Sequence, residues 1–196
     1  MDSGITALPL MDFMAEPASG RALVDRLYGL LGADKRILIW GPRVGAIELA
    51  EDLLMLWPSA GEEVVAVNAG ALCTRTRQDG QDSEWVQWVD TTPQKLLEEV
   101  LARKPKGVVV LFAGPAIVPA LPALLGGPWG FVTAIAASSA EEAQARFAAL
   151  AGDDASRVEV LIGLADVGTA TYISEVRFTS GGPPLAALIH GKYLLG

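Results

Sequence analysis

Apolar and polar positions follow two rhythms along the chain, and these rhythms alternate. Short apolar runs indicate buried strands, whereas apolar residues spaced three or four apart indicate amphipathic helices. The predicted strands cover residues 36–40, 63–68, 107–112 and 131–135. The predicted helices cover residues 19–31, 46–57, 93–104 and 139–150. Because strands and helices alternate, we predict an α/β fold with a mostly parallel sheet and helices on both faces.

The last part of the chain departs from this alternation. Apolar runs at 158–164 and 171–178 flank Asp166-Val-Gly168, a pattern typical of an antiparallel hairpin, and a last strand is expected at 186–190. We therefore expect antiparallel strands at the C-terminal end of the sheet. Together the patterns predict a single domain over residues 18–196, preceded by an N-terminal extension at 1–17.

Two further segments have weaker patterns. The polar residues at 74–84 predict a loop, and a short strand is expected directly after it at 85–89. Prolines interrupt the apolar segment at 114–128. Because proline removes a helical hydrogen bond and clashes with the preceding turn, we predict a broken helix or an extended loop there.

Composition and charge narrow the classes of function. With 196 residues, 51% of them hydrophobic, the chain is long enough and apolar enough to bury a core. Its net charge of −8 opposes nucleic-acid binding. Cys73 and His190 are its only cysteine and histidine, which excludes an internal disulfide and an ordinary zinc site. We predict no metal or other cofactor.

The sequence also carries no signal for a membrane or for export. No uninterrupted apolar run reaches the about 18 residues that a membrane-spanning helix needs. The first residues lack the basic region that opens a signal peptide. We therefore expect a soluble, cytoplasmic protein, which would reach a membrane only by binding another protein.

The predicted strand at 36–40 runs through a turn into a helix, which is the frame of a phosphate-binding loop. A working loop reads Gly-x-x-x-x-Gly-Lys-[Ser/Thr], in which the lysine reaches the phosphates and the hydroxyl holds Mg²⁺. If Gly41 takes the first glycine position, Ala46, Ile47 and Glu48 take the last three positions of the motif. Ile47 has no charge, and Glu48 would repel a phosphate. The frame is therefore present without the residues that bind a nucleotide.

Four more segments follow this frame in a fixed order. The second strand continues as Val64-Val-Ala-Val-Asn-Ala-Gly-Ala-Leu-Cys73, and a helix and the turn Lys104-Pro-Lys106 lead into Val108-Val-Val-Leu-Phe112. Then come Gly127-Pro-Trp-Gly-Phe-Val-Thr-Ala-Ile-Ala-Ala-Ser-Ser139 and the hairpin over 158–177. This order resembles the C-terminal RecA-like domain of the secretion ATPases, the hexameric motors of type II secretion, type IV pili, Tad pili and type IV secretion.

The resemblance implies a RecA-like P-loop NTPase core, and it also marks what is missing. Asn68 and Ala69 stand where the family has an acidic Glu-Asp box, Phe112 stands at the acid that ends the Walker B strand, and Ala136 replaces the histidine of the His box. Phosphoryl transfer depends on positioning and on neutralising charge around the γ-phosphate and Mg²⁺. We therefore predict that the protein is not an enzyme, and that Ile47 and Phe112 fill the former site with apolar side chains.

A fold kept without its chemistry is predicted to act through protein contacts. We expect a scaffold, adaptor or regulator in a pilus or secretion machine, with an active motor ATPase or a second copy of itself as its partner. The candidate contact surface comprises Arg75 and Arg77 in the predicted loop and Trp85 and Trp88 in the strand after it. The spacing of the two tryptophans puts them on opposite faces of a strand, so at most one is expected to be exposed.

Two alternatives stay open. Gly41, Gly45 and the helix N-terminus near Ala46 would present backbone amides to an anion, with Arg43 adding a positive charge, so ATP would bind weakly without hydrolysis. A RecA-like accessory protein of DNA repair would also have the strand, turn and helix at 36–57 and the strand at 107–112. The segments from Gly127 onward favour the secretion family instead.

Overall fold

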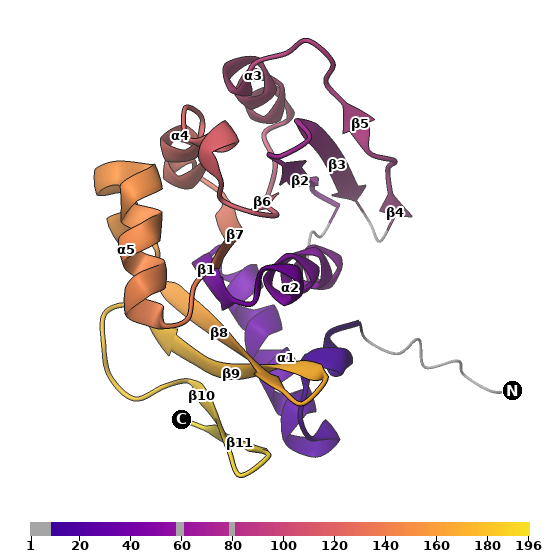
Figure 1. Ribbon diagram of the computed structural model, residues 1–196. Coiled ribbons are helices and arrows are strands. Elements are labelled where there is room, and N and C mark those ends of the chain that lie inside the picture. The colour runs from indigo at the N-terminus through magenta and orange to yellow at the C-terminus, as the bar shows by residue number, and fades with distance from the viewer. Residues whose placement is uncertain (1–8, 58–60, 79–80) are drawn as a thin grey trace, which may run out of the picture.

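The computed structural model describes residues 9–57, 61–78 and 81–196, which form an 11-stranded sheet with helices on both faces (Figure 1). The strands are β1 (Arg36–Gly41), β2 (Val64–Asn68), β3 (Cys73–Gln78), β4 (Gln81–Asp82), β5 (Val86–Gln87), β6 (Gly107–Val110), β7 (Gly130–Ala136), β8 (Val160–Val167), β9 (Ala170–Phe178), β10 (Ala186–Ile189) and β11 (Lys192–Leu195). The helices are α1 (Pro17–Gly32), α2 (Arg43–Leu56), α3 (Pro93–Arg103), α4 (Leu121–Gly126) and α5 (Ala140–Ala151), with the 3₁₀ turns η1 (Pro9–Phe13), η2 (Pro115–Ile117) and η3 (Gly152–Arg157).

The centre of the sheet is parallel, in the order β2-β6-β7-β1-β8. These strands are apolar on both faces because each face is covered by helices. α1 and α2 lie on one face of the sheet and α3, α4 and α5 on the other (Figure 1). The side chains of each group form one core with the face that they cover. The predicted fold class, a mostly parallel sheet between helices with antiparallel strands at the C-terminal end, is confirmed.

The antiparallel strands extend the sheet further than predicted. β8 and β9 form the expected hairpin, β10 pairs with β9, and β11, which the sequence pattern did not predict, pairs with β10. His190 and Gly191 connect β10 to β11 with φ angles of 49° and 76°. Positive φ at both central residues is the signature of a two-residue type I′ turn, which joins tightly paired strands.

The loop predicted at 74–84 is wrong, because β3 lies within this segment and pairs along its length with β2. Its polar side chains find partners inside the fold. The buried Thr74 hydroxyl accepts a hydrogen bond from Trp88 Nε1 at 3.2 Å, and the Arg77 guanidinium donates to the carbonyl of Trp57 at 2.8 Å. β3 is a strand because its backbone pairs with β2, although its own sequence lacks the apolar pattern of a buried strand.

Two predicted helix starts were also wrong. α1 begins at Pro17 and is capped by Glu16, whose carboxylate accepts hydrogen bonds from the amides of Ala18 and Ser19 at 2.9 and 2.8 Å. A hydrogen bond from the Ser19 hydroxyl and these amide bonds lower the pKa of Glu16 to about 2. α2 begins at Arg43, three residues before the predicted Ala46. The caps predicted at Thr92 and Ser139 are present, since their hydroxyls accept from Lys95 N and Glu142 N.

Part of the predicted N-terminal extension belongs to the core. Leu10, Phe13 and Met14 are buried in the same core as α1, whereas residues 1–8 lie outside the described part of the chain. The proline-rich segment forms the short elements η2 and α4 in place of one continuous helix, as predicted. Among the described helices, none combines the length and the apolar character needed to cross a membrane.

The first and last parts of the chain meet at β11, which is an end strand of the sheet. The Tyr193 amide donates to the Ser19 hydroxyl at 3.2 Å, and the Tyr193 hydroxyl donates to the Phe13 carbonyl at 3.1 Å. Arg26 reaches the Gly196 carbonyl at 2.6 Å. α1 therefore covers the outer side of β11, which would otherwise present unpaired backbone groups.

The amino ends of the parallel strands are fixed by close packing and ion pairs. The indole of Trp57, at the end of α2, lies so close to Gly107 and Gly130 that a Cβ on either glycine would approach it within 2.5 Å. Beside it, Lys106 pairs with Asp34 at 2.8 Å and Lys35 pairs with Glu159 at 2.6 Å. These contacts seat α2 on the starts of β6 and β7.

We predict that Gly107→Ala lowers the free energy of unfolding by about 1–3 kcal/mol, because the new methyl group collides with the buried Trp57 indole. Gly29→Ala is the matched control, since Gly29 lies inside α1 with open space around it. This control should raise the unfolding free energy by about 0.5–1 kcal/mol through helix propensity. Urea unfolding measures both, and equal effects of the two changes would disprove the packing explanation.

Candidate functional site

The predicted site lies at the carboxyl ends of the parallel strands, where β1 passes into α2. Only Pro42 separates Gly41, the last residue of β1, from Arg43, the first residue of α2. In a phosphate-binding loop the residues between the two glycines wrap around the phosphates. Here residues 43–46 are already helical, so the connection is a short turn. Pro42 takes the N-cap position, and no side chain caps the first amides of α2.

Gly41 at the end of β1 and Gly45 in the first turn of α2 are both explained by packing against the β8–β9 hairpin. Gly41 has a φ of 148°, and a Cβ there would lie 2.6 Å from the Leu164 Cβ. Gly45 faces Thr171, where a Cβ would lie 2.9 Å from the methyl group. The backbone of this turn approaches the hairpin closely, which only glycine permits at Gly41.

Arg43, Ile47 and Phe112 each contact other side chains of the fold. Ile47 and Phe112 are half-buried and pack against the core formed by α1 and α2. The Arg43 guanidinium lies 4.6 Å from the centre of the Phe112 ring, a cation–π arrangement. The first turn of α2 is therefore linked directly to the segment after β6, although the two are far apart in sequence.

The other predicted positions do not gather around one point. Asn68 Oδ1 accepts from the Gly70 amide at 3.2 Å in the turn after β2, and Ala69 is buried in the core on the α3 side. Ala136 ends β7, and its carbonyl accepts from Arg146 at 2.9 Å. Glu48 is exposed and lines a separate hollow together with Asp12 and Asp52.

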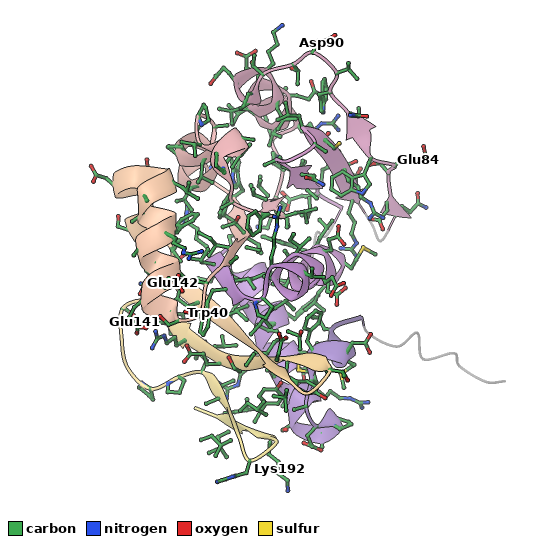
Figure 2. The ribbon with its side chains drawn as sticks, in the orientation of Figure 1. Trp40, Glu84, Asp90, Glu141, Glu142 and Lys192 are labelled. Carbon is green, nitrogen blue, oxygen red and sulfur yellow. The ribbon has the colours of Figure 1, made fainter. Side chains whose placement is uncertain are left out.

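A shallow groove of about 550 Å³ remains beside the turn, between β1, β7, β8 and the start of α5. Gly41, Arg43 and Ala136 contribute to its wall, together with Trp40, which Figure 2 shows near the start of α5. Its charges are mixed, because Arg146 pairs with Glu142 at 2.5 Å and Asp166 lies on the wall formed by β8. In the described part of the chain, no three histidine, cysteine, aspartate or glutamate side chains are placed to hold a metal ion.

The predicted contact surface is largely engaged within the fold. Arg75 pairs with Asp82 at 2.9 Å, Arg77 donates to the carbonyls of Leu54 and Trp57, and Trp88 donates to Thr74. Trp85 alone of the four predicted residues has an exposed side chain, with 38% of the residue accessible. As the spacing predicted, one tryptophan packs inward and the other faces outward.

Sequence reasoning missed an acidic cluster around α2. Glu48, Glu51 and Asp52 share one side of the helix, and η1 adds Asp12. Burial, followed by the charges of Asp12, Glu51 and Glu48, raises the pKa of Asp52 to about 6. The spacing of Glu48 and Asp52 by four residues was a readable signal, because like charges at that spacing repel on a helix.

Comparisons with known proteins support the fold and leave the function open. No protein-family model matches the sequence, and no curated protein sequence is similar to it. Among solved structures, the fold matches the VirB11 ATPase of the Brucella suis type IV secretion system, crystallised in complex with sulphate, with a TM-score of 0.62 and 16% identity. The match covers 82% of this chain and 53% of that chain, so this chain spans about half of the ATPase. At this identity the likeness is one of fold.

We predict that Asp52→Asn raises the free energy of unfolding by about 1 kcal/mol near neutral pH, a value reduced for the partial exposure of the side chain. The raised pKa means that the folded protein binds this proton more tightly than the unfolded chain, so ionised Asp52 costs stability above its pKa of about 6. The cost is relieved as the pH falls through 6 towards 4, and the gain of the variant should vanish there.

Urea unfolding of the variant and of the wild type at several pH values checks this prediction. Asp25→Asn, at an exposed position of α1, is the matched control, and it should change the free energy of unfolding little at any of these pH values. A gain from Asp52→Asn that is equally large at neutral and acidic pH would mean that titration is not its cause.

Proposed function

We propose that the protein is a non-catalytic domain with the fold of a secretion ATPase, and that it acts as a scaffold, adaptor or regulator through protein contacts. The observation that carries the proposal is the turn between β1 and α2. α2 begins at Arg43, directly after Pro42, so residues that would wrap a phosphate belong to a helix. The positions expected to carry charge in a motor hold Ile47 and Phe112 instead.

The energetics of phosphoryl transfer favour this reading. The reaction needs a lysine at the β- and γ-phosphates, a hydroxyl on Mg²⁺ and an acid that orients water or metal. Loss of a single preorganised contact to the transition state typically costs about 10²–10³ in kcat. A chain with Ile47, Glu48 and Phe112 at these positions lacks all three groups, so we expect no useful hydrolysis.

The packing around the turn suggests what replaced the ligand. Ile47 and Phe112 lie against the core, and the Arg43 guanidinium stacks over the Phe112 ring. A nucleotide stabilises a protein only by binding its folded state. In this proposal apolar contacts supply that stabilisation permanently, and the fold no longer depends on a ligand.

Protein partners follow from the fold by analogy. VirB11 is an ATPase of a type IV secretion system, and this chain spans about half of it. We propose that this domain binds a component of such a machine, with an active motor ATPase or a second copy of the chain as candidates. A surface suited to protein contacts would survive the loss of catalysis, since packing and hydrolysis use different residues.

One observation favours weak anion binding as a second candidate. The first amides of α2 have no side-chain cap, and Arg43 is exposed beside them. Free amides at a helix N-terminus together with a positive charge attract anions. Glu142 and Asp166 on the wall of the adjoining groove oppose such binding.

Calorimetric titration with ATP and Mg²⁺, run beside a phosphate-release assay, tests the proposed function. We expect no turnover and no binding tighter than a Kd of about 10 μM, because Ile47 stands at the lysine position of the phosphate loop and Phe112 at the position of the acid. Tighter binding with turnover would overturn the proposal.

Arg43→Ala separates the second candidate from the first. If ATP binds weakly without turnover, and Arg43→Ala weakens that binding while the exposed control Arg21→Ala does not, the site at α2 retains an anion-binding role. Absence of binding in wild type and variants alike supports a role through protein contacts alone.

A further inference from the structure

The outer border of the sheet beyond β3 contains a β-bulge that presents one tryptophan. Arg77 pairs with Asp82, and the Ser83 amide donates to the Thr76 carbonyl at 2.9 Å. If this register continued, Thr74 would pair with Trp85. It pairs with Val86 instead. The outer strand therefore holds one extra residue at Glu84–Trp85. Such bulges commonly redirect a side chain at the border of a sheet.

The residues in and directly after the bulge expose apolar side chains. Trp85, Val86 and Val89 have 38%, 49% and 74% of their surface accessible, and they lie within one short stretch. We call residues 84–90 the Trp85 edge. Figure 1 shows β5 at the outer side of this end of the sheet, and Figure 2 shows Glu84 and Asp90 at its margin. Tryptophan is one of the residue types enriched at the energetic centre of protein interfaces.

The backbone of the Trp85 edge is open on its outer side. The Trp88 amide donates to the Leu72 carbonyl at 3.0 Å, and Val86 pairs with Thr74, so both residues face β3. Backbone groups alternate in direction along an antiparallel strand, which turns the N–H and C=O of Gln87 away from β3. Within the described residues, β5 pairs with β3 only. An extended segment can therefore hydrogen-bond to this edge.

Charge decides what kind of segment fits. Residues 81–92 contain Asp82, Glu84 and Asp90 and no lysine or arginine. Asp82 is neutralised by Arg75, whereas Glu84 and Asp90 are exposed and form no ion pair with the described residues. A second copy would bring the same acids against this edge, and each chain carries a net charge of −8. Repulsion therefore disfavours self-association here, and a cationic segment is attracted.

We propose that the Trp85 edge binds an extended segment of a partner protein in which lysine or arginine alternates with apolar residues. The segment lies along β5, takes backbone hydrogen bonds at Gln87, covers the Trp85 indole with an apolar side chain and pairs its cations with Glu84 and Asp90. Addition of a strand to a free sheet edge is a recognised mode of peptide binding. The inference deepens the proposed function, on which it rests, by assigning the partner's chemistry to one surface.

The probe is a short synthetic peptide of alternating lysine and valine, titrated into the isotope-labelled protein and followed by amide chemical shifts. We expect shifts concentrated at residues 84–90 and in the facing part of β3, with affinity that falls as NaCl rises. Trp85→Ala should weaken binding about 10-fold, as expected for an interface tryptophan. Glu84→Gln combined with Asp90→Asn should remove the salt dependence while leaving the fold intact, because both side chains are exposed.

Controls of the same kind lie elsewhere on the surface. Val167→Ala changes an exposed apolar residue at the β8–β9 turn, and Asp25→Asn with Asp153→Asn removes the same charge from exposed positions of α1 and η3. These variants should bind the peptide like the wild type. Equal binding of a glutamate–valine peptide, shifts centred outside the Trp85 edge, or unchanged affinity of Trp85→Ala would each overturn the proposal.

Self-association of the protein that Trp85→Ala abolishes would also overturn it, because a second copy would then be the occupant. Failure here is distinguishable from failure of the proposed function. A protein without ATP turnover that ignores the peptide leaves the scaffold role standing and removes only this surface. A protein that hydrolyses ATP refutes the scaffold role, whatever the peptide does.

Discussion

The structure at the carboxyl ends of the parallel strands depends on the close approach of α2 to the β8–β9 hairpin. Gly41 and Gly45 bring the backbone of the first turn against Leu164 and Thr171, at a distance that no larger residue would allow without movement. The helix begins directly after β1, with only Pro42 between the two elements. It also aims Arg43 at Phe112 and Ile47 at the core. These contacts join β1, α2, the β8–β9 hairpin and the segment after β6 at the carboxyl end of the sheet.

Different interactions stabilise the amino ends and the carboxyl ends of the parallel strands. At the amino ends, Trp57 lies on Gly107 and Gly130, and the ion pairs of Lys106 and Lys35 surround it. At the carboxyl ends, the contacts are a helix turn, an aromatic ring and a shallow groove with mixed charge. Partly buried pairs with good geometry hold elements in register, whereas a shallow groove leaves surface for other molecules.

Local signals allowed much of the fold to be predicted from sequence. The parallel strands are continuous apolar runs, and the caps at Thr92 and Ser139 are read within a single helical turn. Features that depend on distant partners were missed. β3 is polar and is held as a strand by β2, and Glu16 competes successfully with Ser19 as the cap of α1. The turn of His190 and Gly191 was a local signal for β11, but it lacks the usual Asn-Gly or Asp-Gly pair.

The candidate site was less predictable, because its contacts join segments far apart in the chain. The residues aligned with the phosphate loop predicted where the candidate site lies. They did not predict the early start of α2 or the stacking of Arg43 on Phe112. The Asn68-Ala-Gly70 sequence was a readable signal for the local turn that the Asn68 side chain closes, because asparagine commonly accepts from the amide two residues on. That these positions once served a nucleotide stays a prediction. The fold around these positions is more than a prediction, because the structural likeness to a secretion ATPase supports it independently.

The hydrogen bonds that hold β11 against the N-terminal part of the fold have a consequence for the time course of folding. The hydrogen bond from Tyr193 to Phe13 joins residues 180 positions apart. The entropy of closing so long a loop is lost before the contact returns any energy, and folding slows as such distant pairs become numerous. β11 is therefore expected to dock late, after the parallel centre has formed. Until then the border that Ser19 and Arg26 later cover remains open to pairing with other chains, so a folding molecule is most prone to aggregate just before β11 docks against α1.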